Sequence, residues 1–215
     1  MGRRALRKSP PNLDYSRYFL TVDELPDPWD PAALFGRSVP LEVEVGSGKG
    51  LYLTEAAAAR PEVNHLGIEI AEKYARYTAS RLARRSLENA RALHADAQQV
   101  FVERVPDASL AAVHVYFPDP WWKARHRRRR IMNEVMLPRI EQTLVSGGRL
   151  HFWTDVEEYF QTTLELIAEV TSLEGPHRVP ERSPLHDLDY LTHFERRKRQ
   201  SGEQIHRAEF IRRGE

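Results

Sequence analysis

Three acidic residues stand at the ends of successive short apolar runs, where they can bind one polar ligand together. Glu44 belongs to the run 41–45, Glu69 ends the run 65–69, and Asp96 follows the run 91–94. Carboxylates accept hydrogen bonds from hydroxyl and amino groups. In a parallel α/β sheet the carboxyl ends of the strands meet at one edge, where open sheets bind their ligands. We therefore predict that the three acids share one site.

A glycine-rich turn, Glu44-Val45-Gly46-Ser47-Gly48-Lys49-Gly50, follows the first of these runs. A dinucleotide fingerprint would need glycine at position 51, which is leucine, and a phosphate loop would need glycine at 43, which is valine. The remaining Glu-x-Gly-x-Gly-x-Gly pattern is typical of Rossmann-like methyltransferases that bind S-adenosylmethionine. In such a site Glu69 can accept hydrogen bonds from the ribose hydroxyls of the cofactor's adenosyl group. Asp96 accepts from the adenine amino group or, alternatively, caps the next helix.

The most specific stretch is VHVYFPDPWWKARHRRRRIM at 113–132. Pro118 and Pro120 stiffen the loop around Asp119. The tryptophans that follow can stack on a nucleobase, and Lys123 with the arginines can bind phosphates. An alternative for one tryptophan is that it only packs beneath the loop.

Basic residues are concentrated in three windows, at 1–13, 123–130 and 196–199, none of which contains an acid. These windows hold 14 of the 32 Lys and Arg, which leaves 18 against 31 acidic residues elsewhere. Basic clusters on an acidic body favour a polyanionic partner such as nucleic acid. Any one cluster alone is equally consistent with a solvated face.

The elements that must position these residues alternate between strand and helix from residue 41 onward. We expect strands at 41–45, 65–69, 91–94, 110–116 and 149–154, helices at 51–59, 71–88, 97–103, 131–144 and 156–171, and two short strands around a basic loop beyond 172. This alternation predicts a parallel α/β sheet. Residues 1–40, with six prolines, read as an irregular, basic N-terminal extension to a domain spanning 41–215.

From about 41 to 210 the chain resembles the bacterial tRNA (guanine-N7)-methyltransferases. The resemblance rests on the Glu44 glycine turn, Gly67-Ile68-Glu69, Asp96, FPDPWWKARHRRRR, Thr154-Asp155, Thr192-His193-Phe194-Glu195, Arg197 and Gly202. It implies a Rossmann-like methyltransferase fold, with a mostly parallel seven-stranded sheet and helices on both faces. It also implies methyl transfer from S-adenosylmethionine to N7 of a guanine in the tRNA variable loop.

The resemblance further implies a set of site residues. Asp119 is the expected catalytic residue, which holds the guanine by accepting hydrogen bonds from its N1–H and amino group. The expected cofactor-binding residues are Glu44, Gly46, Gly48, Glu69, Asp96 and Asp119. The expected substrate-binding residues are Lys123, Asp155, Thr192, His193, Phe194 and Glu195. The expected contacts to the tRNA backbone are Arg125, Arg127, Arg128, Arg129, Arg130 and Arg197.

Other features narrow the function. The chain has no cysteine, so thiolate chemistry is excluded, and no His or acid spacing suggests a metal site. No apolar run approaches the roughly 20 residues of a membrane helix, and no export signal is evident, so we expect a cytoplasmic protein. We expect it to be a monomer or a homodimer. Two alternatives stay open. One is an amino-methyltransferase, although Asp119-Pro120-Trp121 lacks the second proline of its loop; the other is a catalytically silent tRNA-binding protein.

Overall fold

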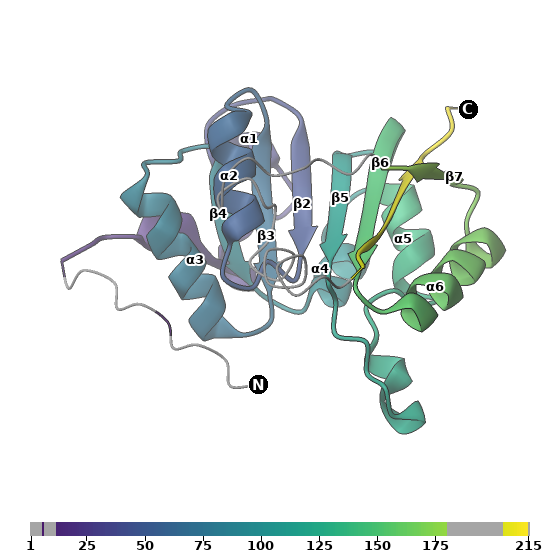
Figure 1. Ribbon diagram of the computed structural model, residues 1–215. Coiled ribbons are helices and arrows are strands. Elements are labelled where there is room, and N and C mark those ends of the chain that lie inside the picture. The colour runs from purple at the N-terminus through teal and green to yellow at the C-terminus, as the bar shows by residue number, and fades with distance from the viewer. Residues whose placement is uncertain (1–5, 7–11, 180–203, 215) are drawn as a thin grey trace.

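A computed structural model describes residues 6, 12–179 and 204–214 of the chain. Helices pack on both faces of a twisted sheet, and the strands of the sheet run through the middle of the molecule (Figure 1). Within the described residues no helix is long and apolar enough to cross a membrane. The arrangement is a doubly wound α/β fold. It contains the parallel sheet that the alternation of elements predicted and the two helical layers that the family resemblance implied.

The sheet has eight strands in the order β1-β4-β3-β2-β5-β6-β8-β7. Neighbours from β1 to β6 pair in parallel, whereas β8 is antiparallel to both β6 and β7. The strand order reverses between β2 and β5, which is the place where open α/β sheets bind ligands. The strands are β1 (Phe19–Thr21), β2 (Leu41–Val45), β3 (Asn64–Glu69), β4 (Ala90–His94), β5 (Leu110–Tyr116), β6 (Leu144–Thr154), β7 (Glu174–Arg178) and β8 (His206–Ile211).

Apolar clusters hold the helices to both faces of the sheet. Leucines and alanines of α2 and α3 pack on one face, and side chains of α4, α5 and α6 pack on the other with the inward residues of β2, β5 and β6. Alternate residues of each strand face opposite layers, which explains why apolar and polar residues alternate in β2 and β5. The α-helices are α1 (Pro31–Phe35), α2 (Leu51–Ala59), α3 (Glu72–Arg84), α4 (Ala97–Glu103), α5 (Met136–Thr143) and α6 (Glu157–Val170).

The N-terminal segment is more regular than we expected. Its described part, residues 12–40, contains two 3-10 turns, η1 (Ser16–Tyr18) and η2 (Val22–Glu24), besides β1 and α1. Phe19 and Leu20 are buried, and β1 pairs with β4, so the segment adds an eighth strand to the predicted seven. Asp30 caps α1, where its Oδ1 accepts from the N–H of Ala32 at 2.8 Å. Burial of these apolar side chains, worth roughly 1.5–3 kcal/mol each, outweighs the high proline content.

Candidate functional site

The predicted acids lie at the carboxyl edge of the sheet, each in or directly after a different strand. Because the parallel strands are adjacent in the order β4-β3-β2-β5-β6, their carboxyl ends form one row. Along that row the residues follow in the order Asp96, Glu69, Glu44, Asp119 and Asp155. The edge also contains the reversal of strand order between β2 and β5, so one extended ligand can contact several of these positions.

The turn between β2 and α2 depends on its glycines. Gly46, Gly48 and Gly50 all have left-handed backbone angles, with φ between 54° and 76°. The N–H of Gly46 donates to the carbonyl of Ile68 at 2.8 Å, which ties the turn to β3. A Cβ on Gly46 would meet nothing within 4 Å, so glycine there leaves open space beside the backbone. Such a turn lets a ligand approach main-chain groups directly.

Glu69 connects the end of β3 to this turn. Its Oε2 accepts from the N–H of Gly48 at 2.8 Å, and its Oε1 accepts from the N–H of Ala71 at 2.8 Å. Each carboxylate oxygen has a second lone pair. Glu69 therefore fixes the shape of the turn and can still accept hydrogen bonds from a ligand.

Glu44 is buried at the end of β2, and its Oε2 has no hydrogen-bond partner among the described residues. Burial raises the pKa of Glu44 well above the ordinary range, and the nearby charge of Glu69 raises it further. An unpartnered carboxylate oxygen in the interior is costly. A cationic group placed beside it would relieve that cost and return the pKa towards its usual value.

Asp96 caps α4. Its Oδ1 accepts from the N–H groups of Gln98 at 2.9 Å and Gln99 at 3.4 Å, which confirms the helix-capping alternative from the sequence. The residue is exposed at the edge of the sheet. Its second carboxylate oxygen keeps the prediction of a ligand contact open.

The loop after β5 bends sharply at two aromatic residues. Phe117 and Trp121 have positive φ angles of 50° and 44°, in a region that bulky residues rarely adopt. The N–H of Phe117 donates to the carbonyl of Trp153 at 2.8 Å, and this hydrogen bond ties the loop to β6. Asp119 lies between the two bends and is exposed. The loop thus presents this carboxylate beyond the end of the strand.

The two tryptophans have different environments. The ring of Trp121 is half-buried, with His126 edge-on at 5.9 Å and the guanidinium of Arg129 at 5.2 Å from its centroid. Trp122 is 62% exposed. Trp121 therefore packs partly against side chains of the basic run, whereas most of Trp122 is exposed. Stacking on a nucleobase stays a prediction for both tryptophans.

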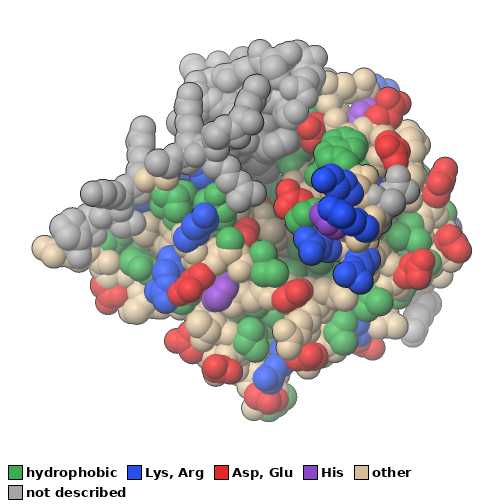
Figure 2. All heavy atoms as spheres, turned by 90° about the horizontal axis from the view of Figure 1, so that it is seen from below, with side chains coloured by type: hydrophobic (Ala, Val, Ile, Leu, Met, Phe, Trp, Pro, Cys, Tyr) green, Lys and Arg blue, Asp and Glu red, His purple; other side chains and the backbone are tan. Residues whose placement is uncertain are grey.

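The basic run forms a short arm that projects past the carboxyl edge of the sheet (Figure 1). It contains the 3-10 helix η3 (Ala124–Arg129), which includes Arg127. Seen from that edge, Lys and Arg side chains gather in one group beside a hollow in the surface (Figure 2). Among the side chains of the arm that the structure describes, the exposed basic ones are Lys123, Arg125, Arg128 and Arg129.

Not every predicted site residue can be placed. Asp155 follows β6 at the same edge and is half-buried. The expected substrate residues Thr192, His193, Phe194 and Glu195, and the expected tRNA contact Arg197, lie outside the described residues. Within the described residues no group of three or more His, Asp or Glu side chains forms a metal site.

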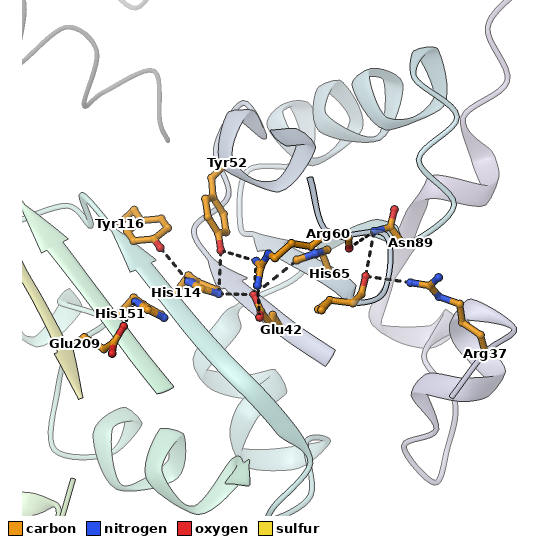
Figure 3. A network of polar contacts seen from close by, with 11 residues as sticks. Arg37, Glu42, Tyr52, Arg60, His65, Asn89, His114, Tyr116, His151 and Glu209 are labelled. Atoms are coloured by element: carbon orange, nitrogen blue, oxygen red, sulfur yellow. Dashed lines mark hydrogen bonds and ion pairs between the residues drawn. The ribbon is translucent and has the colours of Figure 1, made fainter. Parts of the chain in front are cut away.

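A buried polar network lies across the middle strands of the sheet (Figure 3). His114 of β5 is at its centre. The Nε2 atom of His114 lies 2.9 Å from Oε2 of Glu42 and 3.0 Å from the hydroxyl of Tyr52, and its Nδ1 lies 2.9 Å from the hydroxyl of Tyr116. The ring of His151 stacks on it with centroids 4.7 Å apart. None of these contacts was predicted from the sequence.

The charges in this network determine its hydrogen bonding. Burial would raise the pKa of Glu42, but hydrogen bonds from His114 and Arg60 hold it below its usual value. Burial lowers the pKa of His114, so its ring is neutral. Because a carboxylate only accepts, we assign the hydrogen to Nε2 of His114, and Nδ1 then accepts from Tyr116. The network thereby joins α2, which follows the glycine turn, to β5, the strand that precedes the Asp119 loop.

Comparison with known proteins gives consistent results. A family model described as "Putative methyltransferase" matches residues 38–208. A Rhodopirellula baltica protein is 49% identical over 97% of this chain and 79% of its own length, and a Geobacter metallireducens protein is 41% identical over 67% and 68%. Both are named tRNA (guanine-N(7)-)-methyltransferase. The structure of a SAM dependent methyltransferase from Aquifex aeolicus matches 85% of this chain and 94% of that chain, with a TM-score of 0.56. At 13% identity this likeness shows the fold alone.

Proposed function

The chain belongs to the tRNA (guanine-N(7)-)-methyltransferase family, and on that premise we propose that it methylates N7 of a guanine in the variable loop of tRNA. The observation that carries the proposal is the row of acids at the carboxyl edge, next to a projecting basic arm. Neither feature alone requires this substrate. Together they provide a row of polar groups for a small cofactor and a positive surface for RNA.

We propose S-adenosylmethionine as the methyl donor, and the residues at the edge fit it. The unpartnered, buried Oε2 of Glu44 suits a cationic cofactor, and the open space beside Gly46 lets the cofactor approach the backbone. Glu69 has lone pairs free for the ribose hydroxyls. Gly48 shapes the turn, and Asp96 borders the pocket. When bound, the cofactor supplies a methyl group on a positively charged sulfur.

The task of the protein in this reaction is alignment. Guanine N7 carries a lone pair and no proton at neutral pH, so no residue has to act as a base. Holding two reactants in the productive orientation lowers a barrier by roughly 7–11 kcal/mol. We assign Asp119 to the guanine, where its carboxylate accepts from N1–H and the amino group. Its exposed position between two tight bends supports this role.

The tRNA contacts divide between phosphates and the target nucleotide. The exposed cations Lys123, Arg125, Arg128 and Arg129 are suited to phosphates. Asp155 and the segment 192–195 are proposed to contact the substrate on the strength of the family resemblance. A tRNA substrate also favours the cytoplasm, where bacterial tRNA is made and used.

One experiment tests the proposal directly. The protein is incubated with unmodified tRNA and isotopically labelled S-adenosylmethionine, and the nucleosides are then separated and identified by mass spectrometry. We expect labelled 7-methylguanosine. Label in a methylated adenosine or cytidine would favour an amino-methyltransferase, and no label despite tRNA binding would favour a silent binding protein.

A further inference from the structure

Arg130 differs from the exposed arginines of the basic run. Its Nε donates to the carbonyl of Pro120 at 2.8 Å, and its guanidinium carbon lies 4.5 Å from the ring centroid of Tyr159. The side chain is half-buried, whereas those of Arg125 and Arg128 are exposed. The guanidinium therefore packs against the protein body and not towards the solvent that an RNA would replace.

The backbone at Arg130 is also fixed. Asn133 donates from Nδ2 to the carbonyl of Arg130 at 2.8 Å and to Oε1 of Gln98 in α4 at 2.7 Å. The Oδ1 atom of Asn133 accepts from the N–H groups at the start of α5, with Val135 and Met136 both at 2.9 Å. Arg130 thus extends from a point that is anchored to two helices.

The group that Arg130 holds lies in the middle of the Asp119 loop. Pro120 follows Asp119 directly and precedes Trp121, whose φ is 44°. A backbone conformation of this kind is strained and persists only when its surroundings hold it. The bend at Phe117 is tied to β6 through Trp153. The hydrogen bond from Arg130 is the corresponding tie at the second bend.

Tyr159 also connects the two residues. It lies in the first turn of α6, and its side chain is buried. Burial raises the pKa of Tyr159 to about 12; the charge of Arg130 opposes the rise and that of Asp119 adds to it. Both charges therefore act on one aromatic side chain, whose ring packs against the Arg130 guanidinium.

We propose that Arg130 is a positioning residue, which fixes the second bend of the loop and so places the Asp119 carboxylate for the guanine. This inference rests on the proposed function of Asp119. It replaces the expectation from the sequence that Arg130 contacts the tRNA backbone. The substrate class does not change, but one cation of the run is assigned to the methyl-transfer step instead of to RNA binding.

Two substitutions separate positioning from phosphate binding. Arg130→Lys keeps the charge but loses the planar guanidinium, which both donates from Nε and stacks on the ring. Arg130→Gln removes the charge as well. Arg128→Gln serves as the matched control, since Arg128 is an exposed arginine of the same run. Each protein is assayed for kcat, for S-adenosylmethionine affinity by calorimetry, and for the slope of log tRNA affinity against log salt.

We expect Arg130→Lys and Arg130→Gln to lower kcat roughly 10- to 100-fold, because a misplacement of about 1 Å costs on the order of a hundredfold in rate. Their cofactor affinity and salt slope should match those of the unsubstituted protein. Arg128→Gln should instead reduce the slope by up to about 0.9, because it removes one phosphate contact.

Normal kcat in Arg130→Lys, with a reduced slope in Arg130→Gln, would show a phosphate contact and overturn the inference. Normal kcat in both variants would also overturn it. If either variant folds poorly, Tyr159→Leu removes the ring against which the guanidinium packs while leaving Arg130 in place, and the inference again requires a lower kcat at an unchanged slope. Failure of the proposed function is distinct, because the unsubstituted protein would then make no 7-methylguanosine.

Discussion

The Oε2 atom of Glu69 accepts a hydrogen bond from the backbone N–H of Gly48 at 2.8 Å, across the gap between β3 and the glycine turn. The acid proposed to bind the ribose therefore also holds the turn that borders the pocket. Its replacement should affect the cofactor in two ways, by removing an acceptor and by loosening the turn.

Glu69→Ala should weaken S-adenosylmethionine binding by roughly 1–3 kcal/mol, since the ribose hydroxyls lose their acceptor in the pocket. Isothermal titration calorimetry measures the change. Glu72→Ala, which removes an exposed acid three residues later, is the control and should bind normally. Equal affinities for the two variants would remove Glu69 from the cofactor site.

Asp119→Asn should lower turnover much more than tRNA affinity. The amide keeps the shape of the side chain but places a donor opposite the donor groups of guanine, while whole-tRNA binding depends on many phosphate contacts. Steady-state kinetics and a filter-binding assay check the two quantities. Asp107→Asn, at the opposite edge of the sheet, is the control. Near-normal turnover in Asp119→Asn would mean that this carboxylate does not hold the base.

The double substitution Lys123→Gln and Arg125→Gln should flatten the salt dependence of tRNA binding. Each phosphate contact contributes somewhat less than about 0.9 to the slope of log affinity against log salt, so two lost contacts reduce it by under two. Binding is measured across a salt series. Arg85→Gln, on the surface near Glu55, is the control. An unchanged slope would identify the arm as a solvated face.

Stability should fall as the pH drops below 6.5. Burial lowers the pKa of His65 to about 4 and that of His151 to about 3, so the unfolded chain binds protons that the folded protein does not. Between pH 6.5 and 5 each histidine then removes roughly 2 kcal/mol from the free energy of unfolding. Urea unfolding at several pH values tests this. His151→Gln should show a shallower decline; an identical decline would refute the role of His151.

Gly50→Ala should destabilise the protein more than Gly147→Ala. Both glycines have left-handed φ angles, +66° and +75°, so alanine strains either backbone by about 1–2 kcal/mol. Only at Gly50 would the new Cβ clash with Thr78, coming within 2.6 Å of its Oγ1. Urea unfolding compares the two. Equal losses would show that the clash relaxes without cost.

Much of the fold follows from the pattern of the sequence. β2, β5, α2 and α4 have the predicted boundaries because turn residues bracket clear periodic runs. The predicted helix at 131–144 begins only at Met136, since Asn133 accepts from the N–H groups at the start of α5. The short strand β1 was missed because its stability comes from pairing with β4, a contact that local sequence does not encode.

The site was predicted as a set of positions and not as a set of contacts. The ends of the predicted strands locate Glu44, Glu69 and Asp96. That Oε2 of Glu44 is buried without a hydrogen-bond partner depends on side-chain packing, which the sequence pattern does not reveal. Arg130 sits among similar neighbours in the sequence, and its hydrogen bond to Pro120 and its packing on Tyr159 become visible only in the structure. The alternating polar residues of LEVEV (41–45) and VHVY (113–116) predict a polar sheet face. They do not reveal that His114 of β5 forms a hydrogen bond with Glu42 of β2.

The strand topology also has a practical consequence. All the predicted residues that can be placed lie at or beyond the carboxyl ends of the strands, whereas the turn before β3, which includes the exposed Glu62, lies at the opposite end. The chain contains no cysteine, so Glu62→Cys would introduce a unique thiol. A fluorophore attached there would report RNA binding, and a surface linker would immobilise the enzyme. Either would leave the carboxyl edge of the sheet open to RNA.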